Sequence, residues 1–175
     1  GGVNSTMGGA ILNNGTLTVN NSEFTFNGIT GDGGVIYNNG TVISNNSEFS
    51  SNGTTGNGGA IYNNNATLTI TGGLFSGNNA SNFGGAIFHT GNFDLNVTGT
   101  RFTNNTAAFG GAIYNSLGFA FVNSSTFDNN IGLTAGGGIH TDGTMTVGNS
   151  TFFANSSLDG AAFRQDQTVG VGSTS

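Results

Sequence analysis

Residues 58–83 read GGAIYNNNATLTITGGLFSGNNASNF, and the pattern of this stretch recurs along the chain. It opens with two glycines before Ala60 and Ile61, and it contains a phenylalanine, Phe75, with an asparagine three residues later, Asn78. Residue 84 starts the same pattern again. A period of about 20 to 50 residues is the sequence signature of solenoid and propeller folds, so the fold depends on how regularly these two landmarks return.

Both landmarks return in step. The small-residue pair starts at residues 8, 33, 58, 84, 110, 136 and, in a degraded form, 160, which gives steps of 25, 25, 26, 26, 26 and 24 residues. The aliphatic residue that follows the pair is Ile11, Ile36, Ile61, Ile87, Ile113 and Ile139. The second landmark consists of Phe24, Phe49, Phe75, Phe102, Phe127 and Phe152, each followed by Asn27, Asn52, Asn78, Asn105, Asn130 and Asn155.

Each repeat contains three short segments with apolar residues at strand spacing, separated by clusters of Gly, Asn, Ser and Thr that favour turns. No segment has a helical period of useful length. Three strands and three turns in about 25 residues form one coil of a solenoid, in which each strand pairs in parallel with its equivalent one coil away. The sequence therefore predicts an all-β fold: a right-handed, single-stranded parallel β-helix of about seven coils of 25–26 residues.

Stacking of equivalent residues explains the composition of the repeat. We expect the isoleucines and the phenylalanines to form two internal ladders, and the asparagines after the phenylalanines to form a hydrogen-bonded ladder at one corner. The residues directly after the isoleucines form a mostly aromatic row that we expect to face outward: Leu12, Tyr37, Tyr62, Phe88, Tyr114 and His140.

We expect residues 1–175 to form one β-helix domain, with regular coils over about 8–163 and an irregular segment over 164–175. Neither end has an obvious polar cap, although the end coils of a solenoid expose apolar edges and unpaired strands. Two interpretations remain open: the chain is a fragment of a longer protein, or its ends dock head to tail on other copies as a filament.

Composition excludes several function classes. Two basic and eight acidic side chains give a formal charge of −6, so nothing neutralises phosphates, and we expect no nucleic-acid partner. There is no cysteine and no run of about 18 apolar residues, so we expect no disulfide, no thiolate metal site and no membrane insertion by this chain.

The paired GGAI and FxxN motifs resemble the repeats of the chlamydial polymorphic outer membrane proteins. More broadly, they resemble the GGAIYN-type repeats of bacterial surface β-helix and autotransporter passenger proteins. The resemblance covers residues 8–163, nearly the whole chain. It implies a secreted or surface-displayed β-helix, commonly with an adhesive role.

An enzymatic function needs carboxylates that converge on one site. Glu23 and Glu48 share one position of the repeat and should lie about 5 Å apart on an outer face. Five aspartates, in contrast, are expected at different positions of the repeat: Asp94, Asp128, Asp142, Asp159 and Asp166. We therefore predict no catalytic residue and no enzymatic activity.

A metal or cofactor site is not predicted either. We expect His89 and His140 to be outward polar substitutes two coils apart, which excludes a shared metal. Arg101 is expected to pair weakly with a neighbour, and Arg164 to pair with Asp159 or Asp166.

The sequence thus predicts a non-enzymatic, extracellular structural or adhesive β-helix, whose partners are copies of itself or a ligand on a host or cell surface. The alternative is a carbohydrate-binding or polysaccharide-degrading β-helix, and an ice-binding solenoid is a minor one, since outward T-x-T pairs occur in three repeats. Glycans are a further expected partner class, because Asn-x-Ser/Thr sequons are frequent, among them Asn4, Asn14, Asn20, Asn39, Asn45, Asn65, Asn96 and Asn149.

Overall fold

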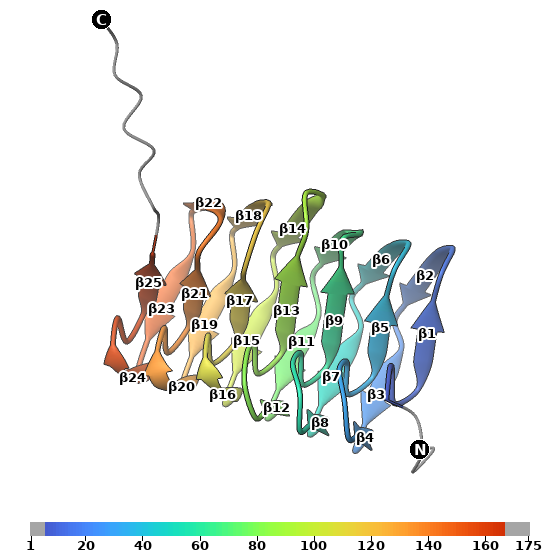
Figure 1. Ribbon diagram of the computed structural model, residues 1–175. Coiled ribbons are helices and arrows are strands. Elements are labelled where there is room, and N and C mark those ends of the chain that lie inside the picture. Colours follow the sequence, from blue (N-terminus) through green and yellow to red (C-terminus); the bar gives the residue numbers. More distant parts are fainter. Residues whose placement is uncertain (1–5, 167–175) are drawn as a thin grey trace, which may run out of the picture.

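The computed structural model describes residues 6–166, and within them the chain winds as one right-handed stack of about six coils (Figure 1). It contains 25 strands and no helix in this range. Every strand pairs in parallel with its equivalent in the neighbouring coil, so the sheets run along the axis of the stack. The predicted fold class, an all-β parallel β-helix, is confirmed.

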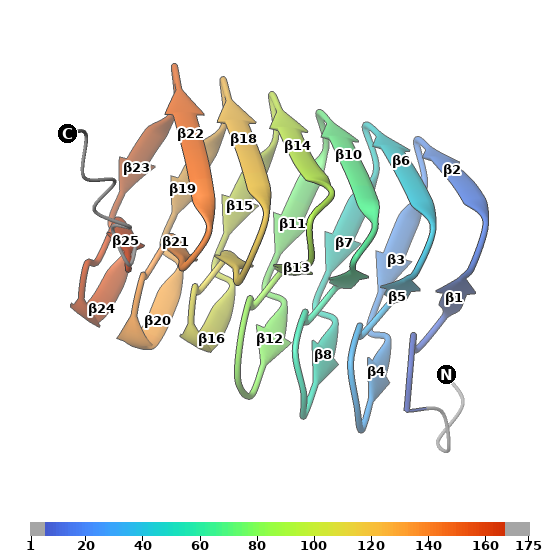
Figure 2. The ribbon, with the colours of Figure 1, turned by 45° about the horizontal axis from the view of Figure 1, so that its top comes forward.

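Four sheets build the solenoid, and we name three of them after their most regular residues. The isoleucine sheet consists of β1 (Ile11–Asn13), β5 (Ile36–Asn38), β9 (Ile61–Asn64), β13 (Ile87–Thr90), β17 (Ile113–Asn115), β21 (Ile139–Thr141) and β25 (Phe163–Gln165). The threonine sheet, which faces the viewer in Figure 2, consists of β2 (Thr16–Asn20), β6 (Thr41–Asn45), β10 (Thr67–Thr71), β14 (Asp94–Thr98), β18 (Phe119–Asn123) and β22 (Thr144–Gly148).

The phenylalanine sheet and a short sheet complete each coil. The phenylalanine sheet consists of β3 (Glu23–Thr25), β7 (Glu48–Ser50), β11 (Leu74–Ser76), β15 (Arg101–Thr103), β19 (Thr126–Asp128) and β23 (Thr151–Phe153). The short sheet consists of β4 (Gly28–Ile29), β8 (Gly53–Thr54), β12 (Asn79–Ala80), β16 (Thr106–Phe109), β20 (Ile131–Ala135) and β24 (Ser156–Asp159).

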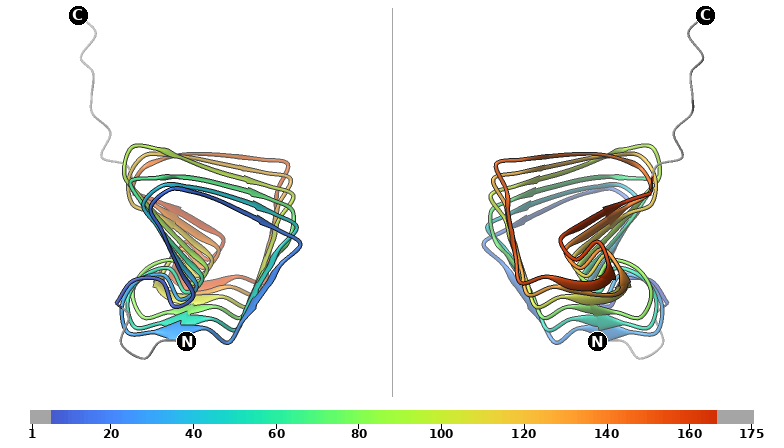
Figure 3. Two further views of the ribbon diagram at one scale, coloured as in Figure 1. Left: turned by 90° about the vertical axis from the view of Figure 1, so that its right-hand side faces the viewer. Right: turned by 90° about the vertical axis from the view of Figure 1, so that its left-hand side faces the viewer.

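The short sheet is the part of the coil that the sequence did not predict, since we expected three strands per coil. Three of its strands have only two residues, and two residues cannot display the alternation of apolar and polar side chains that marks a strand. After the short sheet the chain loops out and turns back to the isoleucine sheet, which the end views make visible (Figure 3).

The core consists of stacked equivalent side chains. Each isoleucine lies in register with the next, from Ile11 with Ile36 to Ile113 with Ile139. The rings of the six phenylalanines stack with centroid distances of 4.7–5.0 Å and interplanar angles of 4–15°. Ile36 to Ile139 and Phe49 to Phe127 are fully buried, so both ladders stabilise the fold through burial of large apolar surfaces.

The asparagines after the phenylalanines form a hydrogen-bonded column, which we call the corner ladder: Asn27, Asn52, Asn78, Asn105, Asn130 and Asn155. The side-chain amide of Asn78 donates to Asn105 Oδ1 at 2.9 Å and to the carbonyl of Phe49 at 2.8 Å. Its Oδ1 accepts from the backbone and side-chain amides of Asn52. Each repeat thus satisfies the polar groups that the bend would otherwise leave unpaired.

The glycine pair is required by close backbone contacts at the start of each isoleucine strand. Gly58 has a φ of +66°, and a Cβ at this position would lie 2.2 Å from the carbonyl oxygen of Ile61. A Cβ on Gly59 would lie 2.1 Å from the carbonyl oxygen of Gly85 in the next coil. Any larger residue would force the coils apart here, which explains why this landmark recurs.

The regular structure continues slightly further than expected. Strand β25 pairs with β21 through Arg164 and Gln165, two residues of the segment that we expected to be irregular. The remainder of that segment, 167–175, lies outside the described residues, as does the sequon at Asn4. No helix in residues 6–166 has the length and apolar character needed to cross a bilayer.

Candidate functional site

The outward row of the isoleucine sheet is the first candidate surface. Its rings stack from coil to coil, with centroid distances of 4.7 Å between Tyr37 and Tyr62, 4.9 Å between Tyr62 and Phe88, and 5.6 Å between Phe88 and Tyr114. His140 continues the column at 4.9 Å from Tyr114. The row faces away from the core, as its position in the strands predicts.

Only the first part of this row is open to solvent. Leu12 is 47% exposed, and Tyr37 and Tyr62 are half-buried, whereas Phe88 and Tyr114 are buried. Two aromatic side chains cover the rest of the row: Phe83, in the loop after β12, packs on Tyr114 at 4.7 Å, and Phe109, the last residue of β16, packs edge-on against His140 at 5.6 Å.

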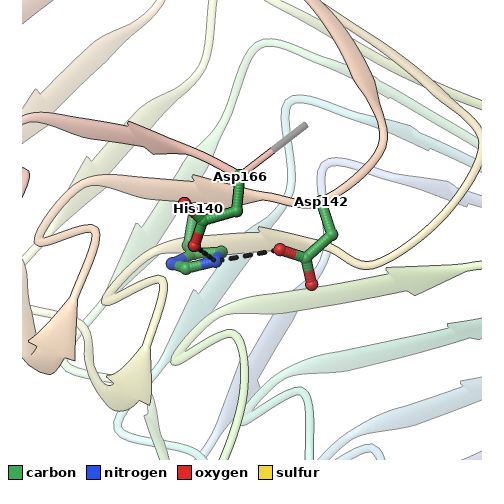
Figure 4. A group of neighbouring side chains, drawn as sticks. All are labelled: His140, Asp142 and Asp166. Atoms are coloured by element: carbon green, nitrogen blue, oxygen red, sulfur yellow. Dashed lines mark hydrogen bonds and ion pairs between the residues drawn. The ribbon is translucent and has the colours of Figure 1, made fainter. Parts of the chain in front are cut away.

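Two carboxylates lie close to His140, the last member of the row (Figure 4). Its Nε2 lies 3.2 Å from Asp142 Oδ1 and 3.5 Å from Asp166 Oδ2. The hydroxyl of Tyr114 donates a hydrogen bond to the second oxygen of Asp142. Burial and this hydrogen bond raise the pKa of Tyr114, so the phenol stays protonated and holds Asp142 in place.

His140 lies in the outward row, as the sequence predicts, but it is covered there: it is 3% exposed, and Phe109 packs edge-on against its ring. One sequence prediction about these residues is wrong. Asp142 and Asp166 do not belong to different positions of the repeat: each directly follows one member of the register pair Thr141 and Gln165. The missing glycine pair of the last repeat concealed this equivalence in the sequence.

His89 is also placed differently from the prediction, because it points into the solenoid. It follows Ile87 by two residues, and residues two apart in a strand point to the same side. The imidazole is fully buried, with Nδ1 2.8 Å from Asn63 Nδ2 and Nε2 2.9 Å from the carbonyl of Phe93. Burial lowers the pKa of His89 to about 4, so the ring is neutral at physiological pH.

His89 belongs to a second internal polar column that the sequence analysis did not identify, and we call it the second ladder: Asn13, Asn38, Asn63, His89, Asn115 and Thr141. Asn13 donates to Asn38 at 2.7 Å, and Asn38 donates to Asn63 at 2.6 Å. The signal was present, because an asparagine follows the isoleucine by two residues in four of the repeats.

The two glutamates behave as a simple outward pair. Glu23 and Glu48 are register partners on β3 and β7, and the next members of the same row are Leu74 and Arg101. No third acid of residues 6–166 stands in this row. The row therefore holds two neighbouring carboxylates, one coil apart.

Arg101 forms a stronger contact than the weak pair that we expected. Its Nε and Nη2 bind both oxygens of Asp128, at 2.9 and 3.1 Å, and Thr103 donates to the same carboxylate at 2.7 Å. The hydrogen bond from Arg101, with help from Thr103 and Asn129, lowers the pKa of Asp128. Arg164 contacts both expected partners, Asp159 and Asp166.

The structure thus offers two features for function: the tyrosines of the outward row and the cluster of His140, Asp142 and Asp166. Among residues 6–166 this cluster is the one group of three histidine or acidic side chains close enough to share an ion.

Comparison with known families identifies the repeats. Four segments match the Chlamydia polymorphic membrane protein repeat, at residues 40–64, 72–90, 99–116 and 124–142. Each segment contains one FxxN landmark and one glycine pair with its strand. The resemblance of the repeats is therefore confirmed. No curated protein and no solved structure matched the chain.

Proposed function

We propose, from the premise that this chain is built of Chlamydia polymorphic membrane protein repeats, that it is a surface-displayed β-helix with a structural or adhesive role and no enzymatic activity. The family points to a cell-surface protein. The solenoid acts as a rigid support, and its outer faces contact partners outside the cell.

The observation that carries this proposal is the contrast between interior and exterior rows. Inside the solenoid the same residue type returns in coil after coil, as in the phenylalanine ladder. The outward row beside those phenylalanines changes residue type at three of its five steps: Glu23, Glu48, Leu74, Arg101, Thr126 and Thr151. An interior that repeats and an exterior that varies are what a scaffold for recognition requires.

The half-buried tyrosines of the outward row are the best candidate contact surface. Tyr37 and Tyr62 stack on each other, so their rings are fixed, and a partner that binds them pays little conformational entropy. Aromatic side chains of this kind are enriched in protein interfaces, and their flat faces also suit sugars.

A binding assay tests the proposal. Fluorescently labelled chain is added to cultured epithelial cells and to immobilised polysaccharides, and we expect saturable binding that the double variant Tyr37→Ala/Tyr62→Ala weakens at least tenfold. The control is Thr16→Ala/Thr18→Ala on the threonine sheet, which should bind like the wild type. Absence of saturable binding to every surface, or equal loss in both variants, would contradict an adhesive role of this row.

A polysaccharide-degrading activity is the second candidate, and the register pair Glu23 and Glu48 is the observation in its favour. Incubation with acidic and neutral polysaccharides should release neither reducing ends nor unsaturated products. Turnover that disappears in Glu23→Gln or Glu48→Gln would replace the structural proposal with an enzymatic one.

End-to-end self-association is a further part of the proposal. The last described coil has a mainly apolar hollow, which a second copy would cover; its lining residues are Met145, Val147, Phe152, Phe163 and Gln165. Negative-stain images of the purified chain should contain rods of several lengths that grow with concentration. Isolated rods of one length at every concentration would contradict this part.

A further inference from the structure

We propose that His140, Asp142 and Asp166 form a binding site for a divalent transition-metal ion of the Zn²⁺ type. One donor atom from each residue, the Nε2 of His140 and one oxygen of each carboxylate, lie within 4.8 Å of one another. All three belong to the last two coils of the isoleucine sheet, where His140 lies on β21 and Asp166 directly follows β25 (Figure 4).

The distances suit a tetrahedral ion. Zinc binds imidazole nitrogen and carboxylate oxygen at about 2.0–2.2 Å, so neighbouring ligands of a tetrahedral site are separated by roughly 3.3 Å. In the protein, Nε2 lies 3.2 Å from Asp142 Oδ1 and 3.5 Å from Asp166 Oδ2. An ion therefore fits between the three side chains with only small rotations of the two carboxylates.

The cluster also departs from the repeat in a specific way. In the first three coils, the position of Asp142 and Asp166 is occupied by Asn14, Asn39 and Asn64. Those amides bind one another, with Asn39 donating to Asn14 at 2.9 Å and Asn64 donating to Asn39 at 2.8 Å. Two carboxylates in the same arrangement have no hydrogen to share and repel each other. A cation between them removes this repulsion.

The third ligand is present only in this coil. Where the preceding coils have Leu12, Tyr37, Tyr62, Phe88 and Tyr114, this coil has His140. The ring is held between Tyr114, on which it stacks with an interplanar angle of 12°, and the edge of Phe109. Its Nδ1 is buried and has no hydrogen-bond partner in the part of the chain that the structure describes, so Nε2 is the nitrogen available to an ion.

Neighbouring groups hold the carboxylates in position. The Tyr114 hydroxyl donates to the Asp142 oxygen that points away from His140, and Arg164 Nε donates to Asp166 Oδ1 at 2.6 Å. Hydrogen bonds of this kind orient metal ligands from outside the coordination sphere. They leave Asp142 Oδ1 and Asp166 Oδ2, the two oxygens nearest to the imidazole, free to bind the ion.

The donor set selects the class of ion. One imidazole nitrogen with two carboxylate oxygens suits Zn²⁺ and similar transition metals, whereas Ca²⁺ and Mg²⁺ favour sites made of oxygen alone. Since Asp142 and Asp166 are each about 40% exposed, the ion would retain water and would be accessible from solution.

Titration of the purified chain with ZnCl₂, after treatment with EDTA, tests the proposal. We expect one Zn²⁺ per chain by isothermal titration calorimetry, a higher melting temperature that EDTA reverses, and no comparable effect of Mg²⁺ or Ca²⁺. Co²⁺ should give the visible absorption bands of a tetrahedral nitrogen and oxygen site.

Three variants restore the residues of other coils, so each should fold. H140Y introduces the residue of the preceding coil, and D142N and D166N introduce the amide of the first three coils; each should weaken Zn²⁺ binding at least tenfold. The matched controls are D94N, an exposed acid on another sheet, and H89N, the other histidine, which should bind like the wild type. Far-ultraviolet circular dichroism checks that each variant is folded.

Two outcomes would overturn the proposal. One is the absence of stoichiometric Zn²⁺ binding by the wild type, which would leave the cluster as a contact between His140 and two aspartates. The other is Zn²⁺ binding that persists in H140Y and D166N, which would place the ion elsewhere on the chain.

Discussion

Two polar ladders run through the interior of the solenoid: one consists of asparagine alone, and the other contains His89 and Thr141 in place of two asparagines. In the corner ladder an asparagine stands in each of the six positions, and each amide donates to the oxygen of the next. In the second ladder the same side-chain hydrogen bonds join Asn13, Asn38 and Asn63. The next contact is from Asn63 to the ring of His89. Asn115, the residue after His89, keeps its Oδ1 buried without a hydrogen-bond partner in the described range 6–166.

The difference follows from the donor count of imidazole. Nδ1 of His89 faces the Nδ2 donor of Asn63, so the proton is on Nε2, where it is donated to the carbonyl of Phe93. A neutral ring has no second N–H to offer to Asn115. Asparagine can extend a column without limit because it carries a donor and an acceptor on one short side chain, whereas a neutral histidine receives from one side and ends the column.

Of the substitutions considered, removal of one asparagine side chain from the corner ladder should reduce the stability of the fold most. Asn78→Ala removes the side-chain donor to the Phe49 carbonyl and the side-chain oxygen that accepts from the backbone and side-chain amides of Asn52, all in a buried corner. At about 1–3 kcal/mol for each unsatisfied buried group, with partial relaxation, we expect a loss of roughly 3–5 kcal/mol in the free energy of unfolding. Denaturation by urea measures it.

The matched control for this substitution is Asn39→Ala. Asn39 also donates to its equivalent one coil away, but its side chain is exposed, so water replaces the lost partner. We expect the free energy of unfolding to fall by less than about 0.5 kcal/mol in Asn39→Ala. Equal losses in Asn78→Ala and Asn39→Ala would mean that the buried column is not what stabilises the corner.

Acid should destabilise the second ladder through His89. The pKa of this residue is about 4 in the folded chain, against 6.5 for the unfolded one, so on acidification the unfolded state takes up the proton first. The free energy of unfolding is unaffected by this group above about pH 6.5 and falls by about 1.4 kcal/mol per pH unit between 6.5 and 4, about 3 kcal/mol in total.

Comparison with H89N isolates this contribution, because the carboxylates titrate in both proteins. When thermal unfolding is measured between pH 7 and 4, the stability of the wild type should fall more steeply with pH than that of H89N. Parallel curves would show that the imidazole accepts a proton without leaving its buried position.

The smallest predicted effect is the difference in stability between substitutions of the two asparagines on either side of His89. Asn63 uses both its oxygen and its nitrogen, whereas only the nitrogen of Asn115 is bonded, to Thr141 at 3.0 Å and to the carbonyl of Thr144 at 3.4 Å. Asn115→Ala should therefore cost about 1–2 kcal/mol less than Asn63→Ala in urea denaturation. A larger loss for Asn115→Ala would mean that its oxygen has a partner in solution, such as an ordered water.

Much of the fold was predictable because a solenoid brings each residue onto its own equivalent. The spacing of the glycine pairs and of the FxxN motifs indicated the coils, and the residue type at each repeated position indicated which rows are apolar and which polar. The short sheet was not predictable, since strands such as Gly28–Ile29 and Asn79–Ala80 are too brief to show a pattern.

The candidate site was less predictable, and the residues involved show why. His140 stands in an outward row by sequence, but Phe109, the last residue of β16, covers it, and no periodicity in the sequence encodes this contact between two sheets. Asp166 meets Asp142 only because β25 pairs with β21 in a repeat that has lost its glycine pair.

The sequence alone thus determined the stacking of equivalent side chains, because a fixed period places like residues one strand spacing apart. The tertiary structure decided which outward side chains are covered and which acids meet a histidine, because these contacts depend on how far each loop swings out before it returns to the stack.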